Sequence, residues 1–488
     1  MDCHHTQQKI SGNVFAIVRN VLKTSRLFMK KLSMSLIILL ISYAVLFSAN
    51  DKLYEIDGRI VDIHNKTNGP KALVKLNNSI ENNNRKAEQV YSIRDTFQIS
   101  LQDSIHWLEM EKNTDYTICI EDVNEGLWKG NDFSYKKEQN CILLNSGKYV
   151  KNGKIWYTTK LGSVYTFNIL VGMKYIDLSK QDHLLGYSMV NISTNQYGQI
   201  HDRDPARFEK INKVLAVDVY KVTECEFIQV LWDSIPSQTN DEYPENYNFW
   251  IEKKKVMGKN DLCDIHDSAA IRVFLYNAFI YANNRSIRDG LQPVYTLKID
   301  NNPDNFSSNK KNSDFYIKGF TFFKSNSDWD MIFVKINKKA NGYRLPYYDE
   351  WMALARGGDK KNYANIWGNL KDSNLAAQYA WFGNHNPNDP ISTKSNEWKK
   401  ESCGEWKQNS QPVGMLKPNA FGLYDMMGLV CENVILENKN LYDYERFTTC
   451  KGGFLTDSLE NMNLNAHCDA RNGAIKTFQG LRLVRQIK

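Results

Sequence analysis

Two cysteines near the C-terminus are the residues whose types and spacing come nearest to a redox or metal site. Cys450 and Cys468 bracket a loop that contains Met462, and His467 stands beside the second cysteine. Thiolate, thioether sulfur and imidazole are ligands of soft and borderline transition metals. In an oxidising compartment, a structural disulfide or two buried thiols is the favoured interpretation of the same cysteines.

Other common chemistries lack their motifs. No Cys-x-x-Cys pair, and no set of cysteines and histidines with zinc-site spacing, stands out in the sequence. The Gly-x-Ser-x-Gly turn of many serine hydrolases is absent as well. The formal net charge of +7 is spread over 488 residues, whereas a nucleic-acid-binding surface needs clustered basic residues. We therefore expect no nucleic-acid partner.

A sharp corner and a helix are predicted to position the region around Cys450 and Cys468. Within Gln411–Val434, the segment Pro418–Asp425 predicts a turn, followed by a short apolar helical run that stops at Gly428. Upstream, Gly342–Gly358 predicts a helix with a proline near its first turn and a Gly-Gly end. Its apolar residues repeat with helical spacing at Trp351, Leu354 and Ala355.

Residues 50–488 divide into two regions. Residues 50–170 contain short β-branched or aromatic runs separated by turn residues, which predicts a small all-β sandwich module. The predicted strands are Arg59–Val61, Ala72–Leu76, Gln89–Tyr91, Thr96–Leu101, Tyr116–Ile120 and Val164–Ile169.

Residues 171–488 mix strands and helices, which predicts an α+β domain. Thr223 and Glu226 form a capping-box pattern at the start of a helix, and Ala269–Asn283 has an amphipathic pattern. Strands are expected at Leu215–Tyr220, Phe315–Ile317 and Met331–Phe333.

Residues 1–49 form a leader. The apolar run Leu32–Ala49 follows Arg26, Lys30 and Lys31, the order found in export signals. A cleaved signal peptide and a retained membrane anchor both fit this run, and in either case the bulk of the chain is expected outside the cytoplasmic membrane. Eight cysteines follow the leader. They allow roughly a hundred pairings, of which Cys119 with Cys141 is the most plausible.

Three blocks of sequence resemble the formylglycine-generating-enzyme family, also called the sulfatase-modifying-factor domain. They are GYRLPYYDEWMALARGG at 342–358, PVGMLKPNAFGLYDMMGLVCEN at 412–433 and GLRLVR at 480–485. The resemblance implies a C-type-lectin-like fold for residues 171–488. The segments DGRIVD, GPKALVKL, DTFQISL and YTICIED in the N-terminal part weakly resemble carboxypeptidase-regulatory-like β-sandwich modules.

Enzymes of that family oxidise a cysteine of a sulfatase to formylglycine, with oxygen as oxidant and two cysteine thiolates that bind copper(I). The two family positions carry Asp457 and Met462 in this chain. The resemblance therefore implies that the oxidase chemistry is lost and that copper is not bound. The alternative is an active oxidase that uses the displaced thiols Cys450 and Cys468, or a related oxidation.

The resemblance also implies a calcium site and several structural residues. Glu432 and Asn433 could hold calcium with backbone carbonyls, although Leu429 stands where the family has an asparagine ligand. The positions that match the family and are expected to maintain the fold are Arg344, Trp351, Arg356, Gly422, Asp425, Arg471 and Arg482. For the arginines we expect internal ion pairs beside buried aromatic rings.

These observations predict an exported or membrane-anchored protein whose C-terminal domain is a binding module. Two loops that we expect to be exposed would contact a peptide or a glycan. The ligand-contact candidates are Trp381, Asn384 and His385 in the first loop and Asp457 in the second. If the leader is not cleaved, its apolar run would also anchor the chain in the membrane.

Overall fold

The computed structural model describes a defined set of residues. They are 71–77, 97–100, 104–120, 126–138, 140–187, 204–239, 245–264, 267–299, 314–319, 330–368, 373–382, 411–436, 448–453, 462–465, 467–468 and 479–487. The leader 1–49, the predicted strands Arg59–Val61 and Gln89–Tyr91, and the candidates Asn384, His385, Asp457 and Arg471 lie outside this set. Residues Val61–Lys488 belong to one compact unit.

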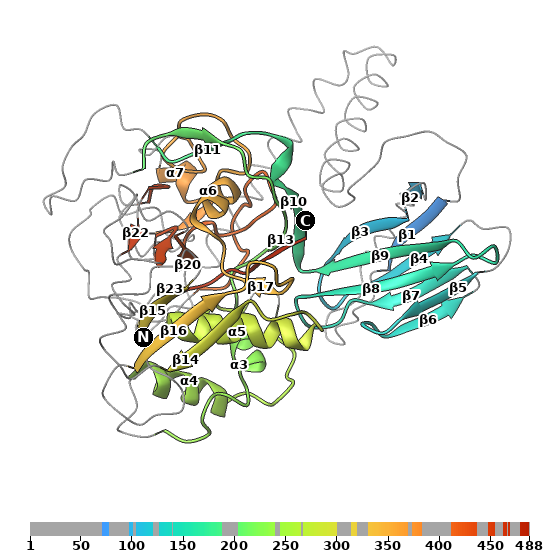
Figure 1. Ribbon diagram of the computed structural model, residues 1–488, viewed down its shortest axis with the longest axis horizontal. Helices are drawn as coiled ribbons and strands as arrows, with labels where there is room; N and C mark the ends of the chain where they lie inside the picture. The colour runs from blue at the N-terminus through green and yellow to red at the C-terminus, as the bar shows by residue number, and fades with distance from the viewer. Residues whose placement is uncertain are drawn as a thin grey trace, which may run out of the picture. The chain divides into compact units, whose positions relative to one another are not determined.

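The N-terminal strands form two sheets (Figure 1). The first has the order β2-β1-β4-β7-β6, with strands Phe97–Ser100, Lys71–Asn77, Asp115–Ile120, Cys141–Asn145 and Tyr135–Glu138. The second has the order β3-β9-β8-β5, with strands Ile105–Met110, Val164–Val171, Lys151–Thr158 and Leu127–Gly130. The strands predicted at 72–76, 96–101, 116–120 and 164–169 are therefore present.

One apolar core joins these two sheets. Tyr116, Ile118 and Ile120 alternate along β4 with half-buried residues, the pattern of a strand with one buried face. They pack in the same cluster as Ile155 of β8 and Phe167 of β9. Cys119 and Cys141 face each other across β4 and β7 and form a disulfide, as the sequence predicts.

The chain enters the C-terminal region through a continuous extended segment. Strand β10 (Met173–Asp177) follows β9 after Gly172, whose φ of 66° turns the backbone. A four-stranded sheet then has the order β10-β13-β24-β17, with β13 at Val214–Asp218, β24 at Val484–Gln486 and β17 at Tyr343–Arg344. The last strand of the chain thus lies beside β13, far from it in sequence.

The remaining elements are short. A 3-10 turn, η2 (Leu178–Lys180), precedes the pair β11 (His183–Leu185) and β12 (Arg207–Glu209). A three-stranded sheet has the order β14-β16-β15, at Tyr295–Ile299, Asp330–Ile336 and Asp314–Gly319. β18 (Ala380–Trp381) pairs in parallel with β19 (Met427–Gly428). The last sheet has the order β22-β21-β20-β23, at His467–Cys468, Thr448–Lys451, Cys431–Ile435 and Gln479–Gly480.

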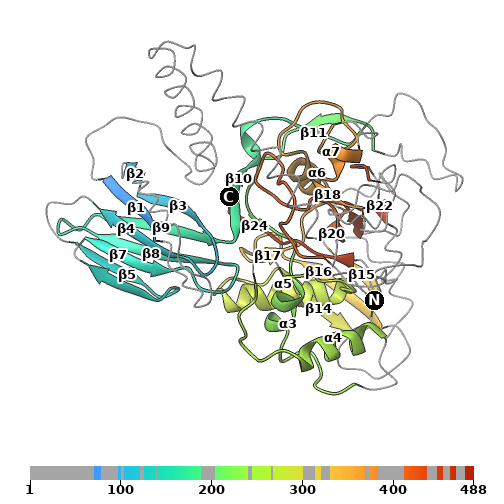
Figure 2. The ribbon, with the colours of Figure 1, turned by 180° about the vertical axis from the view of Figure 1, so that it is seen from behind.

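The described helices are α3 (Glu224–Val230), α4 (Glu245–Lys255), α5 (Leu275–Arg288), α6 (Tyr348–Arg356) and α7 (Ser373–Ala376). Figure 2 shows α3, α4 and α5 gathered together. Thr223 caps α3 by accepting from the Glu226 backbone N–H at 3.2 Å, which confirms the predicted N-terminus. Gly357, with a φ of 61°, ends α6. Few helices among several small mixed sheets make this an α+β region.

Two predicted helical segments need correction. The helix predicted at 269–283 starts six residues later, because Ser268 and Ala269 form β-bridges with Pro412 and Thr223 and keep the backbone extended there. The apolar run after Asp425 is not helical. Met427 and Gly428 instead form β19, paired with β18.

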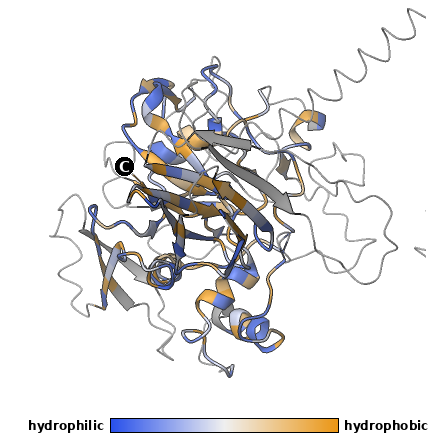
Figure 3. Cartoon of the chain, turned by 90° about the vertical axis from the view of Figure 1, so that its right-hand side faces the viewer, coloured by the Kyte–Doolittle hydropathy of each residue, from blue (hydrophilic) through white to orange (hydrophobic). Residues whose placement is uncertain are grey.

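Among the described residues, two large apolar clusters occupy the C-terminal region, beside a smaller one that contains Trp381. One gathers α3, α4 and α5 around Phe227, Trp250 and Phe279. The other gathers around α6, whose Trp351, Met352 and Leu354 are fully buried. Figure 3 shows hydrophobic and hydrophilic segments interleaved along the strands and helices, as expected for elements with one buried face.

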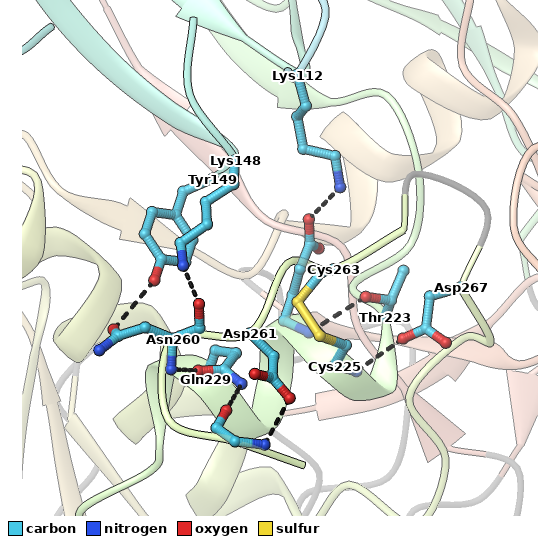
Figure 4. The surroundings of a disulfide bond; sticks show 12 residues. Lys112, Lys148, Tyr149, Thr223, Cys225, Gln229, Asn260, Asp261, Cys263 and Asp267 are labelled. Atoms are coloured by element: carbon cyan, nitrogen blue, oxygen red, sulfur yellow. Dashed lines mark hydrogen bonds and ion pairs between the residues drawn. A yellow bond between two sulfur atoms is a disulfide. The ribbon is translucent and has the colours of Figure 1, made fainter. Parts of the chain in front are cut away.

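A second disulfide fixes the start of α3 (Figure 4). Cys225 is bonded to Cys263, and the Cys225 backbone N–H donates to the Asp267 carboxylate at 2.9 Å. In the same region, the Lys112 ammonium lies 2.7 Å from the Glu226 carboxylate, and both side chains are buried. Lys148 also donates to the backbone carbonyl of Asn260. The Lys112–Glu226 pair therefore ties the segment after β3 to α3.

Candidate functional site

The three cysteines of the C-terminal sheet lie on adjacent strands. Cys431 begins β20, Cys450 lies in β21, and Cys468 ends β22, where its backbone is in register with Cys450. Cys450 and Cys431 form a disulfide, with their Cα atoms 5.4 Å apart, and both residues are fully buried. The sulfur of Cys450 is therefore already bonded. With this disulfide formed, Cys450 is not available as a thiol for a displaced pair with Cys468, the alternative that the sequence left open.

Asp457 and Met462, the residues expected at the family's two cysteine positions, are not thiol ligands. Met462 is fully buried and packs in the same apolar cluster as Trp351, Met426 and Val434. Asp457 is a hard oxygen donor by residue type and lies outside the described residues. Copper(I) needs soft thiolate ligands close together. A disulfide, a core methionine and an aspartate do not fit that requirement.

Glu432 is the centre of a buried charge network. Its Oε1 accepts from the Lys221 ammonium at 2.8 Å and from Arg482 Nε at 3.0 Å, and its Oε2 accepts from Trp351 Nε1 at 2.8 Å. All four side chains are fully buried or nearly so. Burial alone would raise the pKa of the Glu432 carboxyl, but the charges of Arg482 and Lys221 lower it below its usual value. Glu432 is therefore ionised in the core.

This network also determines whether a calcium ion could bind at Glu432 and Asn433. The Lys221 ammonium and the Arg482 guanidinium stand against the carboxylate oxygen that calcium would need, and they already neutralise its charge. Asn433 donates its amide N–H to the Gly480 carbonyl at 3.0 Å. Across the described ranges, no group of three or more histidine, cysteine, aspartate or glutamate residues is arranged to hold a metal. Glu432 and Asn433 therefore do not fit a calcium ion, which requires six to eight oxygen ligands.

The carboxylate of Asp425 lies close to this network. Its Oδ2 accepts from the Gly414 backbone N–H at 2.7 Å, and its buried Oδ1 has no hydrogen-bond partner among the described residues. Burial raises the pKa of the Asp425 carboxyl, and the Gly414 N–H and the Lys221 charge only partly oppose that rise. Gly422, with a φ of 74°, makes the turn that precedes Asp425. Both residues thus shape the predicted corner.

The structural arginines behave in two ways. Arg344 forms a bidentate ion pair with Glu350, at 2.7 and 2.8 Å, and Arg482 pairs with Glu432, as predicted. Arg356 differs from the prediction because it donates to the backbone carbonyls of Lys361 and Gly186 instead of to a carboxylate. Burial lowers the pKa of Arg356 to about 10. Its role is to close loops around the end of α6.

The predicted ligand-contact loop begins inside the core. Trp381 is only 5% exposed and packs with Ala269, Val413 and Leu429. It lies in β18, opposite Gly428, so the parallel pairing carries the ring inward. The expectation of an exposed Trp381 is therefore wrong. The other contact candidates, Asn384, His385 and Asp457, are not among the residues that the structure describes.

The sequence pattern did not single out Lys221, which proves central to this region. A lysine between Tyr220 and Val222 at the end of a strand has the pattern of a surface residue. The one sequence feature that could have pointed to Lys221 is its position in the turn just before the predicted helix. Its buried partner, Glu432, is about two hundred residues further along the chain, so no local pattern links the two.

The small mixed sheets, the few helices and the buried Glu432 network define an α+β domain built around a glycine-rich corner. Residues 179–487 match the family described as sulfatase-modifying factor enzyme 1-like domain, and the chain belongs to that family.

Relatives and solved structures with similarity to the chain carry several names. A protein named Chaperone protein LppX, from Paenibacillus barcinonensis, is 31% identical over 216 residues, which are 44% of this chain and 68% of that protein. Treponema denticola variable protein 1 is 20% identical, covers 68% of this chain and 98% of its own, and has a TM-score of 0.37. PvdO from Pseudomonas aeruginosa is 15% identical, covers 64% and 94%, and has a TM-score of 0.36.

Proposed function

We propose that this protein is a non-catalytic member of its family that binds polypeptide segments outside the cytoplasm. The observation that carries the proposal is the Cys431–Cys450 disulfide. It withdraws Cys450 from metal binding, while the family's cysteine positions hold Asp457 and a buried Met462. Without a thiolate pair, the copper-dependent oxidation of a cysteine has no centre at which to occur.

A polypeptide is the ligand we choose over a glycan. The relative from Paenibacillus is named a chaperone, and chaperones bind polypeptide chains. The family's enzymes also bind an extended sulfatase segment before they oxidise it. A domain that keeps such a binding surface but lacks the thiols would hold a chain without changing it. Trp381 is buried, so the contact residues must come from other side chains of the surrounding loops.

Export is part of this proposal. The apolar run Leu32–Ala49 follows three basic residues, as in an export signal. Three disulfides join Cys119 to Cys141, Cys225 to Cys263 and Cys431 to Cys450, and disulfides persist in oxidising compartments. None of the described helices is long and apolar enough to cross a membrane, and the leader itself is not among the described residues.

Two assays on the purified chain test the proposal. In the first, a sulfatase-motif peptide with a reactive cysteine is incubated with the protein, copper and oxygen, and its mass is followed. We expect no conversion to formylglycine. In the second, a denatured client protein is diluted into buffer with and without the chain. We expect slower aggregation with the chain present, and no effect on aggregation would contradict the binding role.

One observation favours a second candidate, an oxidase. Cys450 and Cys468 are in register on neighbouring strands, so reduction of the Cys431–Cys450 bond would leave two cysteines next to each other. Formylglycine production that requires reductant, and that is lost in Cys468→Ser, would support this candidate. The matched control is Cys263→Ser, which removes a disulfide of α3 far from this sheet in the topology.

A further inference from the structure

Exposed apolar side chains collect at one end of the N-terminal module, the two sheets formed by β1 to β9. Leu161, in the turn between β8 and β9, is 93% exposed, and Ile105, Leu127 and Val164 are 59%, 48% and 48% exposed. The last three are the first residues of β3, β5 and β9. Single exposed apolar residues are normal, whereas a group of them marks an interaction surface. We call these four residues the apolar tip.

Strand register places the members of the apolar tip together. Leu127 of β5 and Val164 of β9 both pair with Thr158, the last residue of β8, from its two sides. Ile105 of β3 pairs with Thr166, two residues further along β9. Directly paired residues share one face of a sheet, and so do residues two apart on one strand. The three strand residues therefore lie on one face, turned away from the core between the two sheets.

The hairpin turn presents Leu161 in a fixed position. The Gly162 N–H donates to the Thr159 carbonyl at 3.0 Å, and the Thr159 N–H donates to the Ser163 carbonyl at 2.9 Å. Turn positions usually carry glycine or small polar residues. A leucine that is almost fully exposed here adds nothing to the core, so its role lies outside the folded chain.

The polypeptide that precedes the module enters it at this same end. β1 begins at Lys71, and its second residue pairs with Ile120, the last residue of β4. The Ile120 backbone N–H and the Trp128 Nε1–H both donate to the Asn140 carbonyl, at 3.2 and 3.0 Å. The start of β1 therefore lies close to the start of β5, where Leu127 is exposed.

The leader is within reach of the apolar tip. Its apolar run ends at Ala49, and residues 50–70 connect it to β1. A segment of this length spans about 70 Å at most, so a leader that lies in a membrane keeps the tip near the bilayer. At its other end, β9 continues through Gly172 into β10 of the C-terminal region. The tip is thus at the end of the module away from that region.

Charge gives this end of the module no preference for anionic lipid. Lys129 and Lys160 are exposed. The sequence between β4 and β5 contains Glu121, Asp122 and Glu125, which lie outside the described residues. Segments that meet at this end therefore carry both signs of charge. Insertion of apolar side chains needs no basic surface, and it is the interaction that the four residues of the tip support.

We propose that the apolar tip inserts into the surface of a lipid bilayer, on the outer side of the membrane that the leader enters. Leu161 reaches deepest, and the three strand residues contact the boundary between head groups and acyl chains. The module then stands on the membrane and holds the C-terminal region away from it, where that region can take up client chains. This inference rests on the export that is part of the proposed function.

Sedimentation with lipid vesicles tests the proposal. The protein begins at residue 50, because the leader would itself bind lipid, and it keeps the whole compact unit Val61–Lys488. It is mixed with vesicles of phosphatidylcholine, with and without phosphatidylglycerol, at low and high salt. We expect binding to both kinds of vesicle with little effect of salt, since salt screens charges and not apolar contacts. Absence of binding, or binding to the anionic vesicles at low salt alone, would overturn the proposal.

Two variants and one control locate the contact. Leu161→Glu changes a side chain that hardly touches the fold, so the protein should fold normally, and we expect vesicle binding to fall by about tenfold. Leu161→Trp keeps a side chain suited to the membrane interface, so its binding should persist. The control is Val256→Glu after α4, an apolar residue that is 82% exposed, and it should bind like the unchanged protein. Equal binding of Leu161→Glu and the unchanged protein would refute the tip as the contact.

A second copy of the chain is the other occupant that an apolar surface could have. Sedimentation velocity without lipid measures the oligomeric state, and we expect no dimer that depends on Leu161. A dimer that Leu161→Glu dissociates would assign the tip to a second copy and overturn the membrane contact. The client aggregation assay contains no lipid, so the polypeptide-binding role and the membrane contact succeed or fail separately.

Discussion

At the scale of single residues, the buried charges of Glu432 and its partners have the largest effect on the stability of the folded protein. A buried ion pair gains little over an apolar core, because each charge loses its hydration. The loss of one partner is much more costly, since it leaves the other charge buried without compensation. Lys221 and Arg482 both depend on Glu432 in this way.

Glu432→Gln should therefore destabilise the protein by roughly 3–5 kcal/mol, the usual cost of an uncompensated buried charge. Urea unfolding followed by tryptophan fluorescence measures this change. The matched control is Glu252→Gln, which removes an exposed ion pair with Lys255. It should cost less than about 1 kcal/mol. Equal losses in the two variants would show that Glu432 is not the centre of a buried network.

At the scale of elements, the corner between Asp425 and Cys431 determines how the sheets meet. Asp425, Gly428 and Leu429 all have positive φ, so the backbone turns twice within five residues. A side chain at Gly428 would clash with the carbonyl oxygen of Trp381. The parallel pairing of β18 and β19 depends on that close approach.

Gly428→Ala should destabilise the protein more than a positive φ alone explains. The left-handed conformation costs an alanine about 1–2 kcal/mol, and the clash with Trp381 adds to this cost. Gly162→Ala is the matched control, because Gly162 also has a positive φ but has open space around its Cβ position. Thermal unfolding of both variants gives the comparison. A Gly428→Ala loss no larger than that of Gly162→Ala would contradict the described corner.

The limits of prediction are clearest at this scale. The N-terminus of α3, the α6 helix and the Arg344–Glu350 pair follow from local patterns, because a cap and a short-range ion pair involve residues close in sequence. The apolar residues Met426 and Met427 suit a helix or a strand equally well in a short run. Their pairing with β18 is a long-range contact, and the same holds for Lys221 with Glu432 and for Cys431 with Cys450. Such long-range contacts cannot be predicted from the local patterns of a single sequence.

At the scale of the whole molecule, one buried carboxylate links several parts of the fold. Glu350 at the start of α6 binds Arg344 of β17 and Lys213 just before β13. The folded-state pKa of Glu350 is about 2, against a usual value of 4.5. Between these pH values the unfolded chain binds more protons than the folded chain, so falling pH favours unfolding. The stabilisation is complete above pH 4.5 and disappears as the pH falls to about 2.

Glu350→Gln should therefore lose stability at neutral pH and approach the unchanged protein in acid. A shift of this size corresponds to about 3 kcal/mol. Urea unfolding of both proteins between pH 7 and pH 2.5 measures the difference in unfolding free energy at each pH. We expect the difference to shrink below about pH 4.5. A difference that stays constant over the whole range would mean that Glu350 has no lowered pKa.

The pairing of Cys450 is the measurement that tests the central claim most directly. The unreduced protein is alkylated, digested and analysed by mass spectrometry for the peptide that contains Cys450. We predict that this peptide is linked to the one that contains Cys431, and that the protein binds no copper(I) through it. If Cys450 and Cys468 are instead both free, and bind one copper(I) per chain, the protein carries an oxidase centre and the non-catalytic account is wrong.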